Sequence, residues 1–203
     1  MELPKKVEWV LSQLHQEGYE AFLVGGCVRD SLLSKPVSDY DICTSALPEQ
    51  TMACFAGKAK VVPTGLEHGT VTIVKEGKPY EITTYRVDGT YADGRHPDQV
   101  TFTPSLEEDL KRRDFTINAM AWDQETGLVD PFGGQRDLEA GIIRCVGEPQ
   151  ERFGEDALRI LRGLRFGAML GFSIDPATEQ AMFQQKELLT KVSAERVQTE
   201  LNR

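Results

Sequence analysis

The residues of this sequence with the clearest chemical potential are two aspartates separated by one position, Asp39 and Asp41. Tyr40 and Ile42 alternate with them and with Cys43, which predicts a β-strand. On a strand both carboxylates leave one face, about 7 Å apart, and repel each other by about 2 kcal/mol at an effective dielectric of about 20. A divalent cation removes that repulsion, and few, hard oxygen ligands suit Mg²⁺ that bridges to phosphates. The alternative, favoured for an isolated Asp-x-Asp, is an exposed edge strand whose acids only oppose aggregation.

A glycine turn shortly before this acidic pair favours the metal hypothesis. The apolar segment Ala21–Val24 predicts a strand, Gly25 and Gly26 follow it, and a helix is expected over Val28–Leu33. Backbone N–H groups at such a turn point at an anion, and glycine lets a phosphate approach closely. Arg29 adds a charge-assisted contact. A phosphate-binding turn followed by a metal-binding acid pair is more specific than either feature alone.

A third carboxylate is available on a later strand. The segments Thr70–Val74 and Tyr80–Tyr85 flank Glu-Gly-Lys-Pro and predict a hairpin. Glu81 lies between two apolar residues of its second strand, so it is a candidate for the same sheet face as the two aspartates. An ordinary exposed strand glutamate is equally compatible with this pattern.

The elements that must position these side chains change in character near residue 146. Up to that point helical and strand patterns are mixed, which predicts an α/β region over 1–146, and after it helices dominate over 147–203. A stretch from Val87 to Asp98, rich in Gly, Asp and Pro, predicts a mobile loop. The other predicted elements are helices from Pro4 to about Gly18, over Leu47–Phe55, from Ser105 to Arg112, before Gly141, over Glu155–Leu170 and from Ser193, and strands over Thr116–Trp122, Leu128–Asp130 and Ile142–Val146.

Composition limits the class of protein. The chain has 203 residues, of which 40% are hydrophobic and 27% charged, so a folded domain with a full core is expected. Lys plus Arg number 23 against 32 for Asp plus Glu, and the net charge of −9 excludes an overall basic nucleic-acid clamp. No apolar run is long enough to cross a bilayer, and the charged N-terminus is not a secretory signal. Four scattered cysteines without zinc spacing suggest free thiols in a reducing cytoplasm. The sequence stops without a helix-capping signal, so we expect a natural continuation.

Five segments together carry a family resemblance. LVGGCVRD, SDYDIC, YEITTYR, RRDFTINAMAWD and EDALRILRGLRF, in this order, resemble the bacterial-type (class II) CCA-adding tRNA nucleotidyltransferases and the related bacterial poly(A) polymerases. The similarity runs from Phe22 to about Arg196. It implies an α+β fold, in which a polymerase β-like nucleotidyltransferase head, a small mixed sheet with helices, occupies 1–146. The start of an all-helical neck, incomplete here because family members are longer, then occupies 147–203.

The resemblance implies template-independent addition of C and A to the 3′ end of tRNA, from CTP and ATP, with release of pyrophosphate. It implies two Mg²⁺ ions on Asp39 and Asp41, with Glu81 as a third catalytic carboxylate on one of them. The loop DGTYADGRHPD favours addition of both bases, because family members restricted to CC addition lack or shorten it. The implied nucleotide-binding residues are Gly25, Gly26, Arg29, Arg113, Asp114, Asp156, Arg159, Arg162 and Arg165.

Two residues of the segment EDALRILRGLRF could select the base through hydrogen bonds. Asp156 and Arg159 are one helical turn apart on the predicted helix; aspartate accepts a hydrogen bond and arginine donates through a planar fork. Cytosine and adenine present an amino donor beside a ring-nitrogen acceptor, whereas uracil and guanine present the reverse, so this pair matches C and A. A surface ion pair is the alternative that pattern alone favours.

The neighbouring charged residues are expected to contact other parts of the nucleotide. Arg113 can reach the triphosphate, and Asp114 can accept from a ribose hydroxyl. Each three-residue step turns by about 60° around a helix, so Arg162 lies nearer the base-reading face, whereas Arg165 faces nearly opposite Asp156. The alternative for Arg165 is to brace the head against the neck.

Three other functions remain compatible with the sequence. A poly(A) polymerase would use ATP only. A catalytically idle head would bind nucleotides as an interaction module, although the intact acidic pair opposes this. A glycosyltransferase that uses Asp-x-Asp leaves the cytosine/adenine pair unexplained. The sequence does not predict an oligomeric state.

Overall fold

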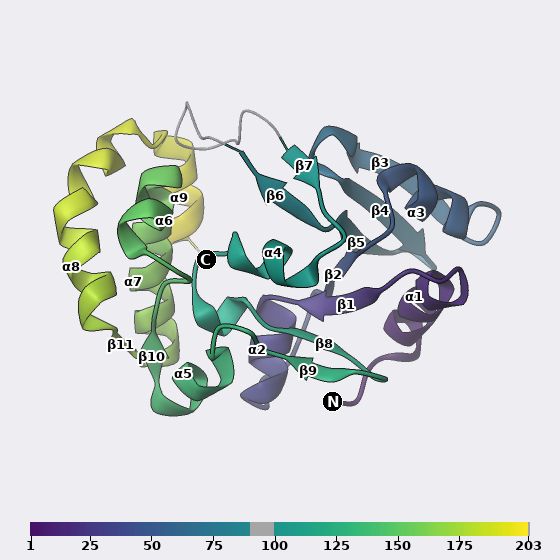
Figure 1. Ribbon diagram of the computed structural model, residues 1–203, viewed down its shortest axis with the longest axis horizontal. Coiled ribbons are helices and arrows are strands. Elements are labelled where there is room, and N and C mark those ends of the chain that lie inside the picture. Colours follow the sequence, from purple (N-terminus) through teal and green to yellow (C-terminus); the bar gives the residue numbers. More distant parts are fainter. Residues whose placement is uncertain (90–99, 203) are drawn as a thin grey trace. The chain divides into compact units, whose positions relative to one another are not determined.

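The structure is a computed structural model that describes residues 1–89 and 100–202 (Figure 1). The chain divides into two compact units. The first comprises Met1–Val87, Val100–Leu110 and Met120–Val129, and the second comprises the described residues within Asp88–Gln99, Lys111–Ala119 and Asp130–Arg203. Each unit is therefore built from more than one segment of the chain. The domain boundary at residue 146 stays a prediction from the sequence.

The first unit is built on a mixed sheet, as the sequence predicts. Among the described residues, seven strands lie in the order β3-β4-β5-β2-β1-β8-β9. Strands β2 and β5 are parallel, and the other neighbours in this sheet are antiparallel. The strands are β1 (Ala21–Val24), β2 (Asp41–Thr44), β3 (Lys60–Gly65), β4 (Thr70–Lys75), β5 (Lys78–Thr84), β8 (Ala121–Asp123) and β9 (Gly127–Val129).

The predicted hairpin forms between β4 and β5. Glu76 and Gly77 both have positive φ, 49° and 77°, as a two-residue type I′ turn requires. Lys75 pairs with Lys78 directly across this turn, which fixes the register along both strands. Strand β3, which pairs with β4, was not predicted, because Pro63 interrupts its short apolar run.

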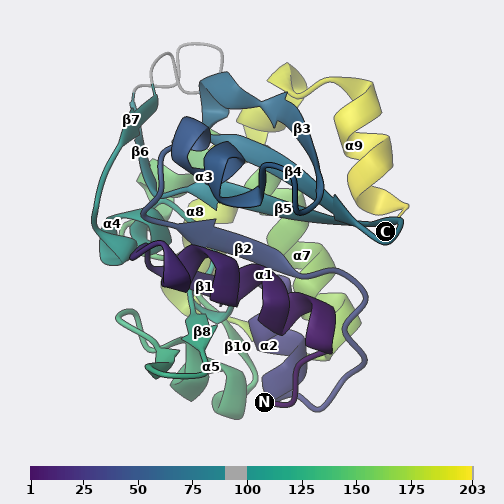
Figure 2. The same ribbon diagram turned by 90° about the vertical axis from the view of Figure 1, so that its right-hand side faces the viewer.

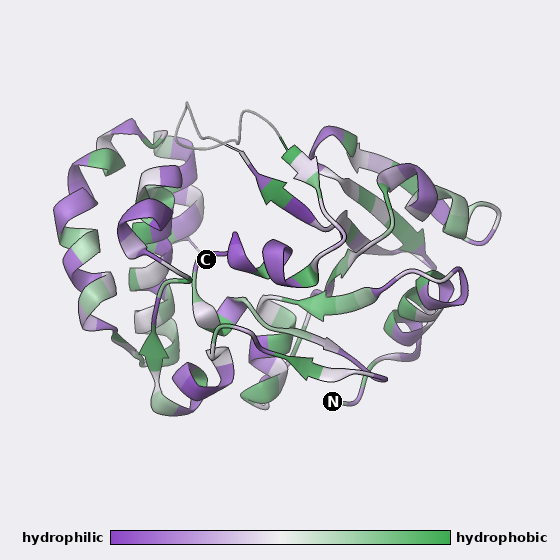
Figure 3. Cartoon of the chain, in the orientation of Figure 1, coloured by the Kyte–Doolittle hydropathy of each residue, from purple (hydrophilic) through white to green (hydrophobic). Residues whose placement is uncertain are grey.

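Helices cover one face of this sheet. Helix α1 (Lys5–Gln16) confirms the helix predicted from Pro4 and buries Val7, Val10, Leu11 and Leu14. Figure 2 shows α1 and α3 (Pro48–Phe55) in front of the sheet, where Trp9 and Phe55 meet edge to face at 5.7 Å. Strand β1 is hydrophobic along its length (Figure 3). The remaining elements of this part are α2 (Gly26–Leu32), η1 (Leu66–His68), α4 (Leu106–Lys111), and the two-stranded sheet of β6 (Arg86–Asp88) and β7 (Val100–Phe102).

The second unit is mostly helical. Helix α7 packs closely on its neighbours at Gly163, because a side chain there would meet Phe115 and Met182. A short parallel pair, β10 with β11, is its only sheet within the described residues. The elements are η2 (Thr116–Asn118), α5 (Gly134–Ala140), β10 (Ile142–Ile143), α6 (Pro149–Glu155), α7 (Leu158–Leu170), β11 (Ser173–Ile174), α8 (Pro176–Gln185), η3 (Lys186–Lys191) and α9 (Ala194–Leu201).

Four sequence predictions need correction. The segment predicted as a strand over Thr116–Trp122 begins as the 3₁₀ turn η2 and extends only at β8. The predicted strand Ile142–Val146 is two residues long, because its parallel partner β11 offers only two residues. The loop predicted from Val87 contains β6, and its residues from 90 onward lie outside the described ranges.

The fourth correction concerns the helix predicted over Glu155–Leu170. It is interrupted at Asp156, whose backbone is extended (φ −147°, ψ 104°). The Asp156 carboxylate accepts from the Leu158 N–H at 3.0 Å and so begins a new helix, in the way short polar side chains compete with helical hydrogen bonds. The buried face of α7 runs through Ile160, Gly163 and Phe166, while Leu164 is exposed.

Among the described helices, none is both long enough and apolar enough to cross a membrane.

Candidate active site

Asp41 and Glu81 lie level with each other on the central strands of the first unit. Ile42 of β2 pairs with Ile82 of the parallel strand β5, so the preceding residue of each strand occupies the same row and the same face. Both acids are exposed, whereas the two isoleucines on the opposite face are buried. The parallel register thus brings together two of the three predicted catalytic carboxylates.

Asp39 does not lie on the strand, and its predicted alternation with Asp41 is wrong. Strand β2 begins at Asp41, opposite Val24, the last residue of β1. Because β1 ends there in a glycine turn, no strand remains to pair with residues 39 and 40 from that side. The exposed Asp39 carboxylate accepts from Ser38 Oγ at 3.0 Å, and Lys78 Nζ donates to the Ser38 carbonyl at 3.2 Å. The Lys78 contact links this segment to β5, whereas the contact between Ser38 Oγ and Asp39 is local.

These carboxylates fit a cation that arrives with its own ligands. Across residues 1–89 and 100–202, no three His, Cys, Asp or Glu side chains form a ready-made metal site. Mg²⁺ seldom uses such an all-protein cage; it keeps waters and substrate phosphates and takes one or two carboxylates. Exposed oxygen donors at 39 and 41, with Glu81 on the Asp41 face, match that requirement.

The glycine turn adjoins the start of β2. Gly25 has φ 72° and ψ −132°, which a side chain would disfavour, and it donates to the Met120 carbonyl at 3.4 Å. Helix α2 begins at Gly26, where a Cβ would lie 3.6 Å from Arg29 Nη2. Arg29 itself forms a two-pronged ion pair with Asp30, at 2.8 and 2.9 Å. The predicted strand, turn and helix are therefore present, and Arg29 is held against its neighbouring acid.

A buried thiol links this turn to the acidic strand. Cys27 Sγ donates to the Val24 carbonyl at 3.1 Å and lies 3.9 Å from the Asp41 carbonyl. Burial raises the pKa of Cys27 to about 11, so the group stays a neutral thiol at neutral pH. It therefore contributes packing rather than a thiolate ligand.

In the second unit, Asp114 is held on both carboxylate oxygens. Oδ1 accepts from the Phe115 N–H at 2.7 Å and from Asn118 Nδ2 at 3.2 Å, while Oδ2 accepts from Arg162 Nε at 2.8 Å and Nη2 at 2.7 Å. Burial alone would raise the pKa of Asp114, but the Arg162 charge and these hydrogen bonds hold the pKa below its usual value. All four acceptor positions are used within the protein. This arrangement suits Asp114 to orienting Arg162, and the predicted ribose contact stays untested.

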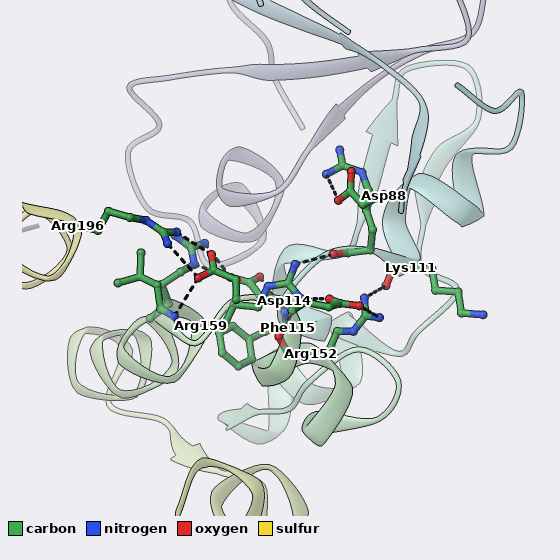
Figure 4. Close-up of polar contacts among 12 residues, drawn as sticks. Asp88, Lys111, Asp114, Phe115, Arg152, Arg159 and Arg196 are labelled. Atoms are coloured by element: carbon green, nitrogen blue, oxygen red, sulfur yellow. Dashed lines mark hydrogen bonds and ion pairs between the residues drawn. The ribbon is translucent and has the colours of Figure 1, made fainter. Parts of the chain in front are cut away.

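Asp156 and Arg159 do not share a helical face, because Asp156 lies in the break between α6 and α7. The Asp156 carboxylate binds Arg196 of α9, at 3.2 Å to Nη1 and 2.7 Å to Nη2 (Figure 4). Arg159 pairs with Glu155 Oε2 at 2.5 Å and donates to the Arg152 carbonyl at 3.2 Å (Figure 4). The two predicted base-reading residues are thus each held by a different partner.

The remaining two arginines of α7 converge on one buried acid of α9. Arg165 Nε donates to Glu200 Oε1 at 2.5 Å, and its guanidinium lies 4.3 Å from the Phe166 ring centroid. Arg162 Nη1 lies 3.8 Å from Glu200 Oε2. Arg165 therefore braces α7 against α9, two helices of the second unit, and its predicted roles toward the nucleotide or between head and neck stay predictions.

Sequence reasoning missed the two α9 residues in these contacts. Arg196 and Glu200 are four positions apart on the helix predicted from Ser193, so they share one face. A charged face of this kind is normally interpreted as solvated. The sequence pattern holds no signal that pairs this face with the charges near α7, because the partners lie 35 and 40 positions away. Arg113, the last predicted residue, lies half-buried just before Asp114.

Comparisons with known proteins agree with the sequence resemblance. The poly A polymerase head domain family matches residues 21–144, and a family described as the probable RNA and SrmB-binding site of polymerase A matches residues 171–203. A CCA-adding enzyme of Geobacillus stearothermophilus is 52% identical over 194 residues, covering 96% of this chain and 47% of that protein. One from Levilactobacillus brevis is 52% identical over 202 residues, covering 98% and 50%.

Solved structures give the same result. The CCA-adding enzyme of Bacillus stearothermophilus in complex with CTP has a TM-score of 0.89 and 48% identity, over 99% of this chain and 48% of that one. The Thermotoga maritima CCA-adding enzyme complexed with tRNA_CCA has a TM-score of 0.81 and 29% identity, over 98% and 47%. The chain spans about half the length of these relatives. Because the head-domain match covers more than half of its residues, the protein belongs to the poly A polymerase head domain family.

Proposed function

We propose that this chain is the head and part of the neck of an enzyme that adds C and A to the 3′ end of tRNA, from CTP and ATP, with release of pyrophosphate. The observation that carries the proposal is the 52% identity with a CCA-adding enzyme across 96% of the chain. The head would occupy 1–146 and the neck 147–203, a division supported by the separate family matches. We place the protein in the cytoplasm, in keeping with its four buried free cysteines.

The first unit would carry the phosphate chemistry. Asp39 and Asp41 would hold two divalent cations, which we propose to be Mg²⁺, and Glu81 lies on the Asp41 face. When bound, one cation would favour deprotonation of the attacking 3′ hydroxyl and the other would neutralise charge on the triphosphate and leaving group. The backbone N–H groups that begin α2 at Gly26, together with Arg29, would orient phosphate oxygens.

The second unit would choose the base. Asp156 would accept from the amino group that cytosine and adenine share, and Arg159 would donate to the adjacent ring nitrogen. Within residues 1–89 and 100–202, three of the five Arg159 N–H groups are used, by Glu155 and by the carbonyls of Arg152 and Arg112, so two donors have no partner there. Arg113 and Arg162 would contact the triphosphate or ribose, with Arg162 oriented by Asp114 and Arg165 supporting α7.

The test is incorporation of labelled nucleotides into a tRNA that ends before CCA. We expect CTP alone to give two additions, ATP alone to give little, and both together to complete CCA. Repeated addition from ATP alone would indicate a poly(A) polymerase instead. Binding of CTP or ATP without incorporation, on any RNA 3′ end, would indicate a nucleotide-binding module.

A further inference from the structure

The carboxylate of Asp156 is held both by its own segment and by a residue that is distant in the chain. Oδ1 accepts from the Leu158 N–H at 3.0 Å and from Arg196 Nη1 at 3.2 Å, and Oδ2 accepts from Arg196 Nη2 at 2.7 Å. The Asp156 side chain is 15% exposed and the Arg196 side chain 20% exposed, so the fork is shielded but not sealed from solvent. The fork joins residues forty positions apart in the chain.

A count of acceptor positions shows what this arrangement leaves for a ligand. An ionised carboxylate has about four acceptor positions, two on each oxygen. Within the described part of the chain, Leu158 and Arg196 fill both positions on Oδ1 and one on Oδ2. One acceptor position on Oδ2 remains. A single amino group of cytosine or adenine needs one acceptor, so the vacant position matches the ligand in number and in kind.

Without the fork, the same carboxylate would lack a fixed plane. The terminal torsion of aspartate is broad, and one hydrogen bond from Leu158 fixes one oxygen without fixing the rotation of the other. A rotating carboxylate can also accept from the ring N–H of uracil or guanine. A planar guanidinium that binds both oxygens fixes the plane, which a point charge does not do.

We propose that Arg196 is a positioning residue for base selection: its fork fixes the plane of the Asp156 carboxylate so that one acceptor on Oδ2 is presented to the amino group of C or A. This inference rests on the proposed function of the second unit. It adds a residue of α9, outside the segment EDALRILRGLRF that carries the base-reading resemblance.

The experiment measures binding of CTP, ATP, UTP and GTP to the chain in the presence of Mg²⁺, for wild type, Arg196→Ala and Arg196→Lys. We expect wild type to prefer CTP and ATP, and Arg196→Ala to reduce that preference at least tenfold, or about 1.4 kcal/mol. Arg196→Lys keeps the charge but not the fork, so it should recover only part of the preference.

The matched control is Arg144→Gln. Arg144 also binds carboxylates in the second unit, those of Asp137 and Asp175, and has no contact with Asp156. The Arg144→Gln variant should have a lower unfolding temperature, and its folded form should keep the wild-type preference for CTP and ATP over UTP and GTP. If Arg196→Ala fails to fold, Arg196→Lys decides the question.

The outcomes separate the two proposals. A folded Arg196→Ala or Arg196→Lys variant with the full wild-type preference would overturn the inference alone. An equal loss of preference in Arg144→Gln would also overturn it, because general loosening of the unit would then explain the effect. A wild-type chain that binds all four nucleotides equally, or none, would overturn the proposed base choice and the inference with it.

Discussion

Asp41 and Glu81 face the same side of the sheet at the same level, although forty residues separate them. The relationship follows from the parallel pairing of Ile42 with Ile82, because side chains alternate along each strand. The exposed acids and the buried isoleucines therefore occupy opposite faces of the same two strands.

Substitution of either acid should impair catalysis without unfolding the chain. We expect Asp41→Ala to abolish CTP incorporation while nucleotide binding persists, and Glu81→Gln to reduce incorporation by about 10–100-fold. Because both side chains are exposed, the free energy of unfolding should change by less than about 0.5 kcal/mol. The control is Glu67→Gln, which alters another exposed acid of the same unit. It should change neither CTP incorporation nor the free energy of unfolding. Normal turnover of Asp41→Ala would remove the metal assignment.

Loss of the Asp156 carboxylate should relax base choice. Asp156→Ala removes the acceptor that C and A require, so incorporation of UTP and GTP should rise relative to CTP and ATP. It also removes the hydrogen bond to the Leu158 N–H, which should cost about 1 kcal/mol of stability. Asp156→Asn keeps an oxygen for that N–H and separates the two effects. Continued exclusion of UTP and GTP by Asp156→Ala would contradict the template role.

Close packing at Gly163 predicts a large stability effect from one methyl group. A Cβ at this position would meet the terminal atoms of Met182 and Phe115, so Gly163→Ala should destabilise the chain by about 1–3 kcal/mol. At Gly154 of α6, no described atom outside the local helix backbone lies within 4 Å of the equivalent position. Gly154→Ala should therefore be neutral or slightly stabilising. Urea unfolding measures the free energy of unfolding of both variants. An equal change in the two would contradict the close packing inferred at Gly163.

The Asp114–Arg162 pair predicts a pH-dependent contribution to stability. The pKa of Asp114 is lower in the folded chain than its value of about 3.9 in an unfolded one, so folding favours the ionised form. Its contribution is complete above about pH 4 and falls as the pH drops toward the folded-state pKa. Asp114→Asn leaves the half-buried Arg162 charge with the longer contact to Glu200, at 3.8 Å, and should cost about 1–3 kcal/mol at pH 7.

The measurement is the difference in unfolding free energy between wild type and Asp114→Asn at pH 7 and at about pH 3. The difference should shrink at the lower pH, because protonation of Asp114 weakens the pair in the wild type as well. Asp130→Asn is a useful comparison, since that carboxylate accepts from two backbone N–H groups and pairs with no described basic side chain. A difference that is the same at both pH values would contradict the assigned role of the ion pair.

The sequence by itself determined the elements whose signals lie within a few residues. Ala21–Val24 is a strand, and the turn at Glu76 and Gly77 joins a hairpin, both as predicted. The local reason is that backbone conformation at these sites follows from glycine and from short apolar runs. The order of the motifs also carried the family, which the comparisons confirm.

Only the tertiary structure decided which charged side chains hold one another. Asp39 looks like a strand residue locally, yet β1 ends before it can pair. Asp156 looks like a helix residue, yet it binds Arg196 and begins a new helix. Both outcomes depend on segments that are distant in sequence. A pattern of neighbouring residues does not specify which distant residue will form the contact in the folded chain.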